Sequence, residues 1–252
     1  MQPHQKKPSD SLAKSVLPKP LWRAIENIFQ SGVSETQLVG GTAIAGFYMG
    51  HRRSDDIDLF SKDQASFKAT LASVKHLTNI GARFLKETLS NLYFHSVCEL
   101  EGHRFTVDIV VDANLFKVAS FEKTDLGIQI ASLETLYKMK IATLVSRCSE
   151  KDLYDLFVLS QEFPRKDIEK FVSMGLTIDG GVNAENMLAS LESSQLSKES
   201  CGFALSEKMT SLDIFKDIEK FRSNLIQDLI DFLQNSPPPK LASLIRKAKK
   251  LI

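Results

Sequence analysis

Cysteine is scarce in this chain of 252 residues, and its three cysteines lie far apart, at Cys98, Cys148 and Cys201. An odd number of scattered cysteines suits a reducing cytoplasm and excludes the close spacing of a zinc site. No apolar run reaches the roughly 20 residues that a membrane-spanning helix needs. Residues 1–19 also lack the apolar stretch of a signal peptide. We therefore expect a cytoplasmic protein that has no membrane partner.

An excess of charge of either sign is absent as well. The chain has 32 Lys and Arg residues against 31 Asp and Glu residues, for a formal net charge of +1 at pH 7. The overall charge therefore argues neither for nor against a nucleic-acid partner, and any such surface has to be local. No internal repeat is visible, and a hydrophobic content of 43% is enough for a substantial core. We expect one compact unit with two lobes.

Composition and periodicity divide the chain into four segments. Residues 1–19 are polar, with prolines and lysines, and are expected to form a flexible N-terminal arm. Residues 20–130 contain the strand-like patterns, whereas residues 131–235 have helical periodicity and are expected to form a second lobe. Residues 236–252 contain three consecutive prolines and then a basic helix. That helix either packs its apolar face on the body or offers its basic side chains to RNA phosphates.

The first motif is a glycine pair between a strand-like and a helix-like segment. Gly40 and Gly41 follow an expected strand over residues 37–39 and precede an expected helix over residues 42–49. Glycine lets the backbone approach a phosphate closely, and the start of a helix offers free N–H groups to an anion. Thr42 can add a hydroxyl group. A glycine pair alone is usually a turn, so the motif gains its meaning from the residues that come after it.

Two carboxylates come next, after a short polar segment that contains Arg52 and Ser54. Asp56 and Asp58 alternate with Ile57 on an expected strand, so both point to the same face. They can hold a hard divalent cation, and Mg²⁺ commonly takes one or two carboxylates together with phosphate oxygens. The guanidinium group of Arg52 suits phosphate. An isolated Asp-x-Asp is usually a solvated strand end, but the joint order of these features favours a site that holds an NTP.

A third carboxylate lies in an expected hairpin. Residues 92–97 and 104–111 are rich in β-branched and aromatic residues and flank Glu101–Gly102. Asp108 is surrounded by apolar neighbours in the second strand, where an unpaired carboxylate is costly to bury. It either lies on a solvated face of the sheet or joins Asp56 and Asp58. In the second case it binds metal near the acceptor hydroxyl or takes the proton of that hydroxyl.

The helical half contains three further charged candidates. Ser132 is a suitable N-cap for a helix that contains Lys140, and the next helix contains Asp152 and Asp155 on one face. Taken singly, each of these residues is typical of the charged surface of an amphipathic helix.

These residues together resemble the AbiEii/AbiGii-type nucleotidyltransferase toxin family, which belongs to the DNA polymerase beta-like nucleotidyltransferase superfamily. The resemblance spans residues 20–165 with motifs and the helical remainder more loosely. The matching segments are Gly40-Gly41-Thr42, Gly50-His51-Arg52, Ser54, Asp56-Ile57-Asp58-Leu59-Phe60, Val107-Asp108-Ile109, Met139-Lys140, Lys151-Asp152 and Asp155-Leu156. Two departures are Lys151, where the family commonly has Arg, and the extra carboxylate of Asp55.

The resemblance implies an α+β nucleotidyltransferase fold, in which a mixed or antiparallel sheet flanked by helices precedes an all-helical C-terminal lobe. It implies transfer of a nucleoside monophosphate from an NTP to an acceptor, with Mg²⁺ or Mn²⁺ as cofactor and release of pyrophosphate. It also implies a role for each matching residue: Asp56, Asp58 and Asp108 bind metal and are catalytic, together with Lys140 and Asp155; Gly40, Gly41, Thr42, Arg52, Ser54, Lys140 and Asp152 bind the nucleotide.

Three hypotheses of function remain open at this point. The leading one is a toxin of a toxin–antitoxin system that modifies RNA, with the tRNA 3′ end as acceptor and a cognate antitoxin protein as partner. The second keeps the chemistry but transfers the nucleotide to a protein hydroxyl or to a small molecule such as an antibiotic. The third is a non-catalytic module that binds an NTP or a partner.

Overall fold

A mixed sheet forms the centre of the N-terminal lobe in this computed structural model, which describes residues 6–163, 167–205 and 209–235. Within these residues the sheet has seven strands. Their order across the sheet is β3 (Arg83–Leu89), β4 (Tyr93–Leu100), β5 (His103–Val111), β2 (Asp56–Ser61), β1 (Thr36–Val39), β7 (Gln129–Ala131) and β6 (Phe121–Lys123).

Strand β2 lies at the centre of the sheet and pairs differently with its two neighbours. It runs antiparallel to β1, with Val39 opposite Asp58, and parallel to β5, with Asp58 beside Asp108. Strands β4 and β5 form the predicted hairpin. Its turn residues Glu101 and Gly102 have φ values of 52° and 77°, as a two-residue type I′ turn requires. The turn thereby fixes which β4 residue lies beside Asp108.

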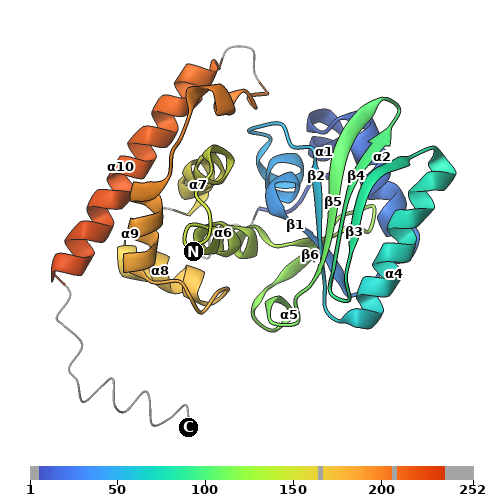
Figure 1. Ribbon diagram of the computed structural model, residues 1–252, viewed down its shortest axis with the longest axis horizontal. Coiled ribbons are helices and arrows are strands. Elements are labelled where there is room, and N and C mark those ends of the chain that lie inside the picture. Colours follow the sequence, from blue (N-terminus) through green and yellow to red (C-terminus); the bar gives the residue numbers. More distant parts are fainter. Residues whose placement is uncertain (1–5, 164–166, 206–208, 236–252) are drawn as a thin grey trace, which may run out of the picture.

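Helices cover one face of this sheet and leave part of the other face open. Helices α2 (Lys19–Gln30) and α4 (Gln64–Lys75) pack on the covered face, as Figure 1 shows. Helix α2 buries Leu21, Ile25 and Ile28, at the spacing expected for one helical face. Shorter elements complete the lobe: α1 (Asp10–Val16), α3 (Gly40–Thr42), η1 (Ala43–Met49), η2 (His76–Ile80) and α5 (Leu115–Val118).

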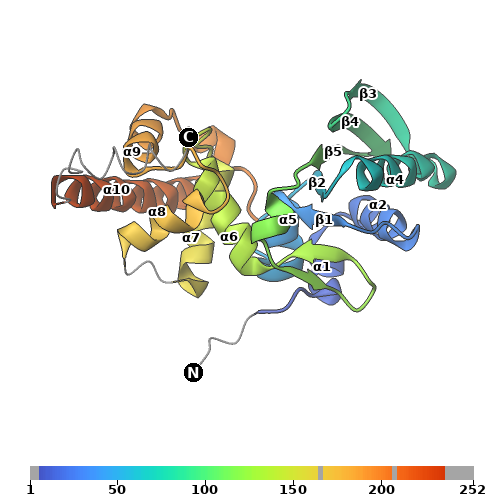
Figure 2. The ribbon, with the colours of Figure 1, turned by 90° about the horizontal axis from the view of Figure 1, so that it is seen from below.

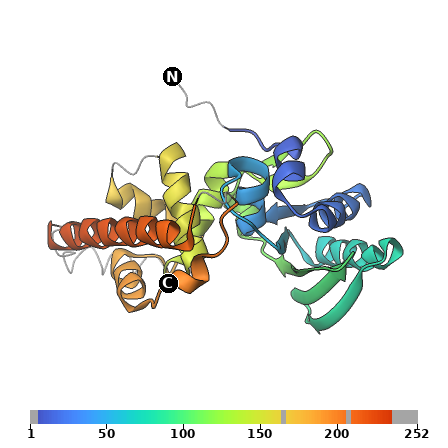
Figure 3. The same cartoon turned by 90° about the horizontal axis from the view of Figure 1, so that it is seen from above.

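The second lobe is helical. Figures 2 and 3 show α10 lying along this lobe on the side away from the sheet, whereas the β3–β4 pair projects at the opposite end of the molecule. The elements of the second lobe are α6 (Leu133–Thr143), α7 (Glu150–Glu162), α8 (Ile168–Leu176), α9 (Ala184–Ser193), η3 (Lys198–Cys201) and α10 (Ser211–Asn235). Ser132 caps α6 as predicted, because its side chain accepts a hydrogen bond from the Thr135 N–H.

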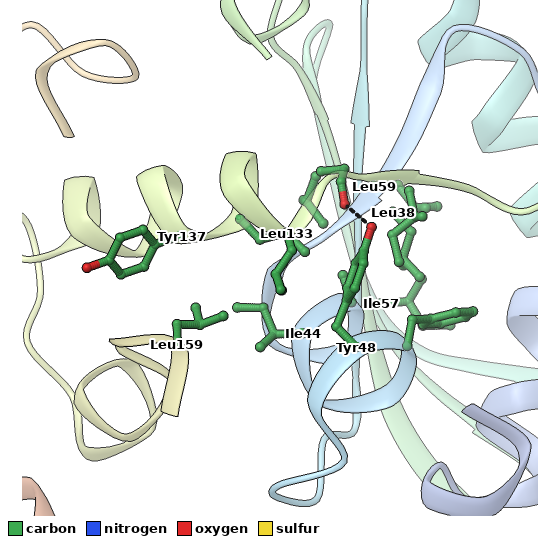
Figure 4. Close-up of a cluster of buried hydrophobic side chains, with 14 of the residues drawn as sticks. Leu38, Ile44, Tyr48, Ile57, Leu59, Leu133, Tyr137 and Leu159 are labelled. Carbon is green, nitrogen blue, oxygen red and sulfur yellow. Dashed lines mark hydrogen bonds between the residues drawn. The ribbon is translucent and has the colours of Figure 1, made fainter. Parts of the chain in front are cut away.

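The two lobes share one hydrophobic core. Leu38 from the sheet, Ile44 from η1, Leu133 from α6 and Leu159 from α7 belong to the same buried cluster (Figure 4). Tyr48 lies among them and donates a hydrogen bond of 3.0 Å to the carbonyl oxygen of Ala131, the last residue of β7, two residues before α6 begins. Packing therefore holds α6 and α7 against the end of the sheet where the predicted site residues lie.

The predicted α+β class with a mixed sheet and a helical C-terminal lobe is confirmed. The flexible arm is wrong for the part that the structure describes, because residues 10–16 form α1 and both Ala13 and Leu17 are buried. The expected helix after the glycine pair is largely a π-helix, in which the Gly50 N–H bonds to the Ala45 carbonyl. The predicted basic helix over residues 236–252 lies outside the described residues.

Within the described ranges, no helix combines the length and the apolar character that crossing a membrane would require.

Candidate active site

The three predicted carboxylates lie on the open face of the sheet, on two neighbouring strands. Asp56 and Asp58 alternate along β2, and the parallel register places Thr106 beside Asp56 and Asp108 beside Asp58. The Thr106 hydroxyl donates a hydrogen bond of 2.8 Å to Asp56 Oδ1. All three carboxylates line one cavity. Asp108 thus lies at one cavity with Asp56 and Asp58, and its side chain is also partly exposed to solvent.

The pKa of Asp58 is strongly perturbed by its surroundings. Burial raises its pKa from 3.8 to about 6, and the negative charges of Asp56 and Asp108 act in the same direction. Lys140 and Arg147 oppose this rise but do not cancel it. The cluster is therefore short of positive charge at neutral pH.

The glycine pair is required by the side chains that pack against it. Gly40 has a φ of +72°, and a Cβ atom there would lie 1.9 Å from Asp58 Oδ2. A Cβ atom on Gly41 would lie 2.2 Å from Arg52 Nη2. The two glycines thus let the loop between β1 and η1 approach both the metal-binding candidate Asp58 and the buried guanidinium group.

Thr42 and Ser54 lie beneath this loop and do not line the cavity. Both side chains are buried. The Thr42 hydroxyl lies 2.9 Å from Ser54 Oγ and also reaches the main-chain carbonyl of Asp56. These contacts tie the start of β2 to the glycine loop. In this geometry the two hydroxyl groups support the glycine loop from behind.

A buried ion network links the glycine loop to α7. Asp155 is 0% exposed, and Arg52 binds it with both prongs, Nε–Oδ1 at 2.6 Å and Nη2–Oδ2 at 2.9 Å. His51 Nε2 lies 2.8 Å from Oδ1, and Lys140 Nζ lies 2.7 Å from Oδ2. Burial alone would raise the pKa of Asp155, but Lys140 and Arg52 hold it well below its usual range. Asp155 lines neither the cavity of the three carboxylates nor the apolar cavity beside it, so its place is that of a positioning residue.

Asp152 completes the network at the N-terminus of α7. It pairs with Lys140 Nζ at 2.7 Å and with Arg147 Nε at 3.1 Å. Ser149, the N-cap of α7, donates from Oγ to Asp152 Oδ2 at 2.6 Å. Burial alone would lower the pKa of Lys140, but Asp155 and Asp152 outweigh it and raise that pKa. Lys140 therefore stays a cation at the wall of the cavity.

Two adjoining cavities meet at these residues. The polar one has a volume of about 290 Å³ and the apolar one about 150 Å³. They share Gly41, Asp58, Lys140 and Arg147. The remaining lining of the polar cavity is Arg52, Asp56, Thr106, Asp108, Ser149, Lys151 and Asp152, and that of the apolar cavity is Val39, Gly40, Ile44, Phe60, Leu136, Met139 and Thr143.

The structure thus gathers most of the predicted site residues around one cavity, while Thr42, Ser54 and Asp155 lie behind its wall. Sequence reasoning gave no site role to Thr106, Arg147, Ser149 or Lys151. Two signals were available: Thr106 lies two residues before Asp108 on the same strand face, and Arg147 lies seven residues after Lys140.

Two β4 side chains also reach the site, and sequence reasoning missed both. The Tyr93 hydroxyl donates a hydrogen bond of 2.7 Å to Asp108 Oδ1, and His95 Nδ1 lies 3.0 Å from the same oxygen. The hydrogen bond to Asp108 raises the pKa of Tyr93 to about 12, so its hydroxyl remains a donor. The signal was the hairpin register, which places His95 directly opposite Asp108.

The carboxylates suit a divalent metal that arrives with phosphate. Among the described residues, no group of three or more His, Cys, Asp or Glu side chains is arranged to hold a metal ion alone. Asp56 and Asp58 nevertheless offer two oxygen ligands at the lip of the polar cavity, as Mg²⁺ uses when phosphate oxygens supply the rest.

Known proteins resemble this chain in sequence and in fold. The family model described as nucleotidyl transferase AbiEii toxin, type IV TA system, matches residues 34–234. An uncharacterized protein of Aquifex aeolicus (strain VF5) is 32% identical over 155 residues, which are 59% of this chain and 70% of that protein. MenT4, a nucleotidyltransferase toxin from Mycobacterium tuberculosis H37Rv, has a TM-score of 0.53 at 13% identity, with 91% of each chain covered. JHP933 from Helicobacter pylori has a TM-score of 0.49 at 14% identity, over 88% of this chain and 95% of that chain.

Proposed function

Because this chain belongs to the AbiEii nucleotidyl transferase toxin family of type IV toxin–antitoxin systems, we propose that it transfers a nucleoside monophosphate from an NTP to RNA. The observation that carries this proposal is the polar cavity, in which three carboxylates on the sheet face Lys140 and Arg147 from the helical lobe. Such a cavity has negative side chains for metal on one wall and positive side chains for phosphate on the other.

The NTP would lie across both cavities. Its phosphates fit the polar cavity, where Lys140, Arg147 and Lys151 supply cations. Its nucleoside fits the adjoining apolar cavity, where Phe60, Leu136 and Met139 supply hydrophobic walls. The α-phosphate then lies near Asp58 and Gly41, which line both cavities.

Asp56 and Asp58 would hold Mg²⁺ or Mn²⁺, with Asp108 beside them on the acceptor side. A bound metal would supply positive charge to the phosphates and to the leaving group. In the reaction the acceptor oxygen forms a bond to the α-phosphorus, and the bond from that phosphorus to the bridging oxygen breaks. Pyrophosphate leaves with the electron pair of that bond. Asp108 is placed to orient the acceptor hydroxyl or to take its proton.

Lys140 has two roles in this scheme. Its ammonium group touches the cavity, and its ion pairs with Asp152 and Asp155 fix where that charge lies. Arg52 acts through Asp155, because the bidentate pair occupies its guanidinium group. The network thus holds a cation at the NTP phosphates with little freedom to move.

The acceptor that we propose is the 3′ end of tRNA, in the cytoplasm, with a cognate antitoxin protein as the regulating partner. The toxin family supports the antitoxin and the NTP. The tRNA acceptor rests on the family resemblance of the sequence motifs, and a protein hydroxyl or a small molecule such as an antibiotic is the competing acceptor. A non-catalytic module is disfavoured, since Asp56, Asp58 and Lys140 are all present at one cavity.

The test is transfer of label from each α-³²P NTP, with Mg²⁺ or Mn²⁺, to total RNA, total protein and small molecules. Asp56→Ala and Asp58→Ala should each lower transfer at least about 100-fold, the usual loss when charge stabilisation of a transition state is removed. The matched control is Asp125→Asn, which changes an exposed carboxylate at the β6–β7 turn. Label that enters only protein or small molecules would overturn the RNA acceptor, and full activity of Asp58→Ala would overturn the mechanism.

A further inference from the structure

The side of Asp108 that faces away from the helical lobe is built by β4. Cross-strand pairing places His95 opposite Asp108, and Tyr93 lies two residues away on the same face. Both side chains reach the same carboxylate oxygen, Oδ1. An ionised carboxylate only accepts hydrogen bonds, so His95 Nδ1 carries the proton in this contact. Within the described residues, no hydrogen bond from Tyr93 or His95 reaches Asp108 Oδ2.

The hydrogen-bonded group of Tyr93, His95 and Asp108 is partly exposed to solvent. The Tyr93 residue is 38% exposed, and the Asp108 side chain is 24% exposed. Figure 2 shows that the β3–β4 pair extends well away from the helical lobe, with α4 on its other face. A ring that is both exposed and bonded to a site carboxylate can touch a large ligand that approaches Asp108 from this side.

The surrounding sheet face suits a polyanion. Lys86 lies opposite Val97 and Thr88 opposite His95, so both share the face of Tyr93. Arg104 lies on the same face of β5, four residues before Asp108, where strand alternation places it. It pairs there with Glu99 of β4, Nε–Oε2 at 3.2 Å, and Arg83 of β3 contacts the same carboxylate. The acids of the site lie at one end of this face, and farther out the basic residues Lys86, Arg83 and Arg104 outnumber Glu99. Phosphates of an acceptor strand are therefore attracted along the face while its terminal sugar lies near the acids.

We propose that Tyr93 and His95 form the acceptor side of the site: their hydrogen bonds orient Asp108, and the exposed Tyr93 ring stacks on the terminal base of an RNA acceptor. This inference rests on the proposed function, because it assigns the acceptor of the same reaction. Stacking on an aromatic side chain is the common way in which proteins hold an unpaired RNA base. The ring and the hydroxyl of Tyr93 thus have separable roles.

The separation can be measured with two substitutions at one position. Tyr93→Phe keeps the ring and removes the hydroxyl, so kcat should fall about tenfold while the KM values for RNA and NTP stay within about twofold. Tyr93→Leu also removes the stacking surface, so the KM for RNA should rise a further tenfold or so, with the NTP value unchanged. Thermal unfolding of each variant checks that the fold is kept.

His95 is tested by rescue. His95→Asn keeps a nitrogen donor close to the position of Nδ1, and His95→Ala removes it. We expect the Asn variant to keep kcat within about threefold and the Ala variant to lose about tenfold. The control for both positions is Leu126→Ala. Leu126 is 43% exposed, close to the 38% of Tyr93, and lies in the β6–β7 turn at the opposite edge of the sheet.

Four results would overturn the proposal. The first is wild-type transfer to RNA that Tyr93→Phe and Tyr93→Leu leave unchanged. The second is a rise in the KM for NTP in place of that for RNA, and the third is an equal loss in Leu126→Ala. Failure of the proposed function is distinguishable, since the wild-type protein would then label no RNA at all. The fourth is label that enters protein and does so equally in the wild type and in Tyr93→Leu. This face would then have an occupant other than an RNA base, and the stacking role of Tyr93 would be wrong.

Discussion

At the scale of single residues, the negative charge of Asp58 that the proposed function requires also destabilises the folded protein. Its pKa lies near 6 in the folded protein, above the ordinary value of 3.8, because burial and two neighbouring carboxylates disfavour its charge. Between these two pH values the folded state binds more protons than the unfolded state. The free energy of unfolding therefore falls as pH rises through this window, and the full penalty persists above pH 6.

Asp58→Asn should consequently stabilise the metal-free protein at pH 7.5 while it abolishes transfer. A shift of about two pKa units corresponds to about 3 kcal/mol, which raises Tm by several degrees in a chain of this size. The gain should shrink to below about 1 kcal/mol at pH 4, where the carboxyl of Asp58 in the folded wild-type protein is protonated and therefore as uncharged as the Asn amide. Scanning calorimetry at the two pH values measures it, with Asp125→Asn as control. A variant that is less stable at pH 7.5 would contradict the assignment.

Other residues of the site differ in how far the sequence predicts them. The glycine pair and the two β2 carboxylates can be inferred from local rules, since strand alternation and the special freedom of glycine are properties of neighbouring residues. The burial of Thr42 and Ser54 cannot be inferred from such rules. It depends on how α3 packs over the start of β2, and a hydroxyl group in a motif looks the same whether it faces a ligand or a carbonyl oxygen.

At the scale of elements, the β4–β5 hairpin was predicted from the sequence, whereas the contacts of its β4 side chains with Asp108 were not. A two-residue turn at Glu101–Gly102 fixes the register of β4 and β5, and that register alone pairs His95 with Asp108. The prediction of a flexible arm over residues 1–19 was wrong for a different reason. Its prolines and lysines suggest disorder, but Leu17 packs against Gly46 of η1, and that contact is long-range. Helix α1 is therefore a product of tertiary burial that local composition does not reveal.

Helix α7 carries a buried ion network and an exposed ion pair that should differ greatly in energy. Asp155 is buried between Arg52 and Lys140, whereas Glu162 on the same helix pairs with Lys6 at the exposed surface. Asp155→Asn leaves the buried guanidinium group of Arg52 without its charge partner and Lys140 with Asp152 alone, and should lower the free energy of unfolding by about 3–5 kcal/mol. Glu162→Gln should lower it by less than about 1 kcal/mol.

Urea unfolding followed by circular dichroism measures both variants. If the two substitutions cost the same, the buried network is not what holds α7 against the glycine loop. A variant Asp155→Asn that keeps its stability but loses transfer would instead indicate a direct catalytic contact, which its burial in this structure does not provide.

At the scale of the whole molecule, the site belongs to neither lobe alone. The polar cavity is lined by β2 and β5 from the sheet, by Lys140 from α6 and by Asp152 from α7. Lys140 and Arg147 also line the apolar cavity, so an NTP that fills both cavities contacts the two lobes at once. Binding energy that depends on both lobes stabilises the arrangement in which they are packed together.

Hydrogen exchange should therefore slow in both lobes when a non-hydrolysable NTP and Mg²⁺ are added. We expect added protection in β2, in α6 and at the start of α7, and none in the β6–β7 hairpin, whose residues line neither cavity. In Lys140→Met the protection should be lost from the helical lobe first, because the cation that joins α6 to the phosphates is gone. Protection that is confined to the sheet in the wild-type protein would mean that the nucleotide binds to one lobe, and the proposed position of the NTP across both cavities would be wrong.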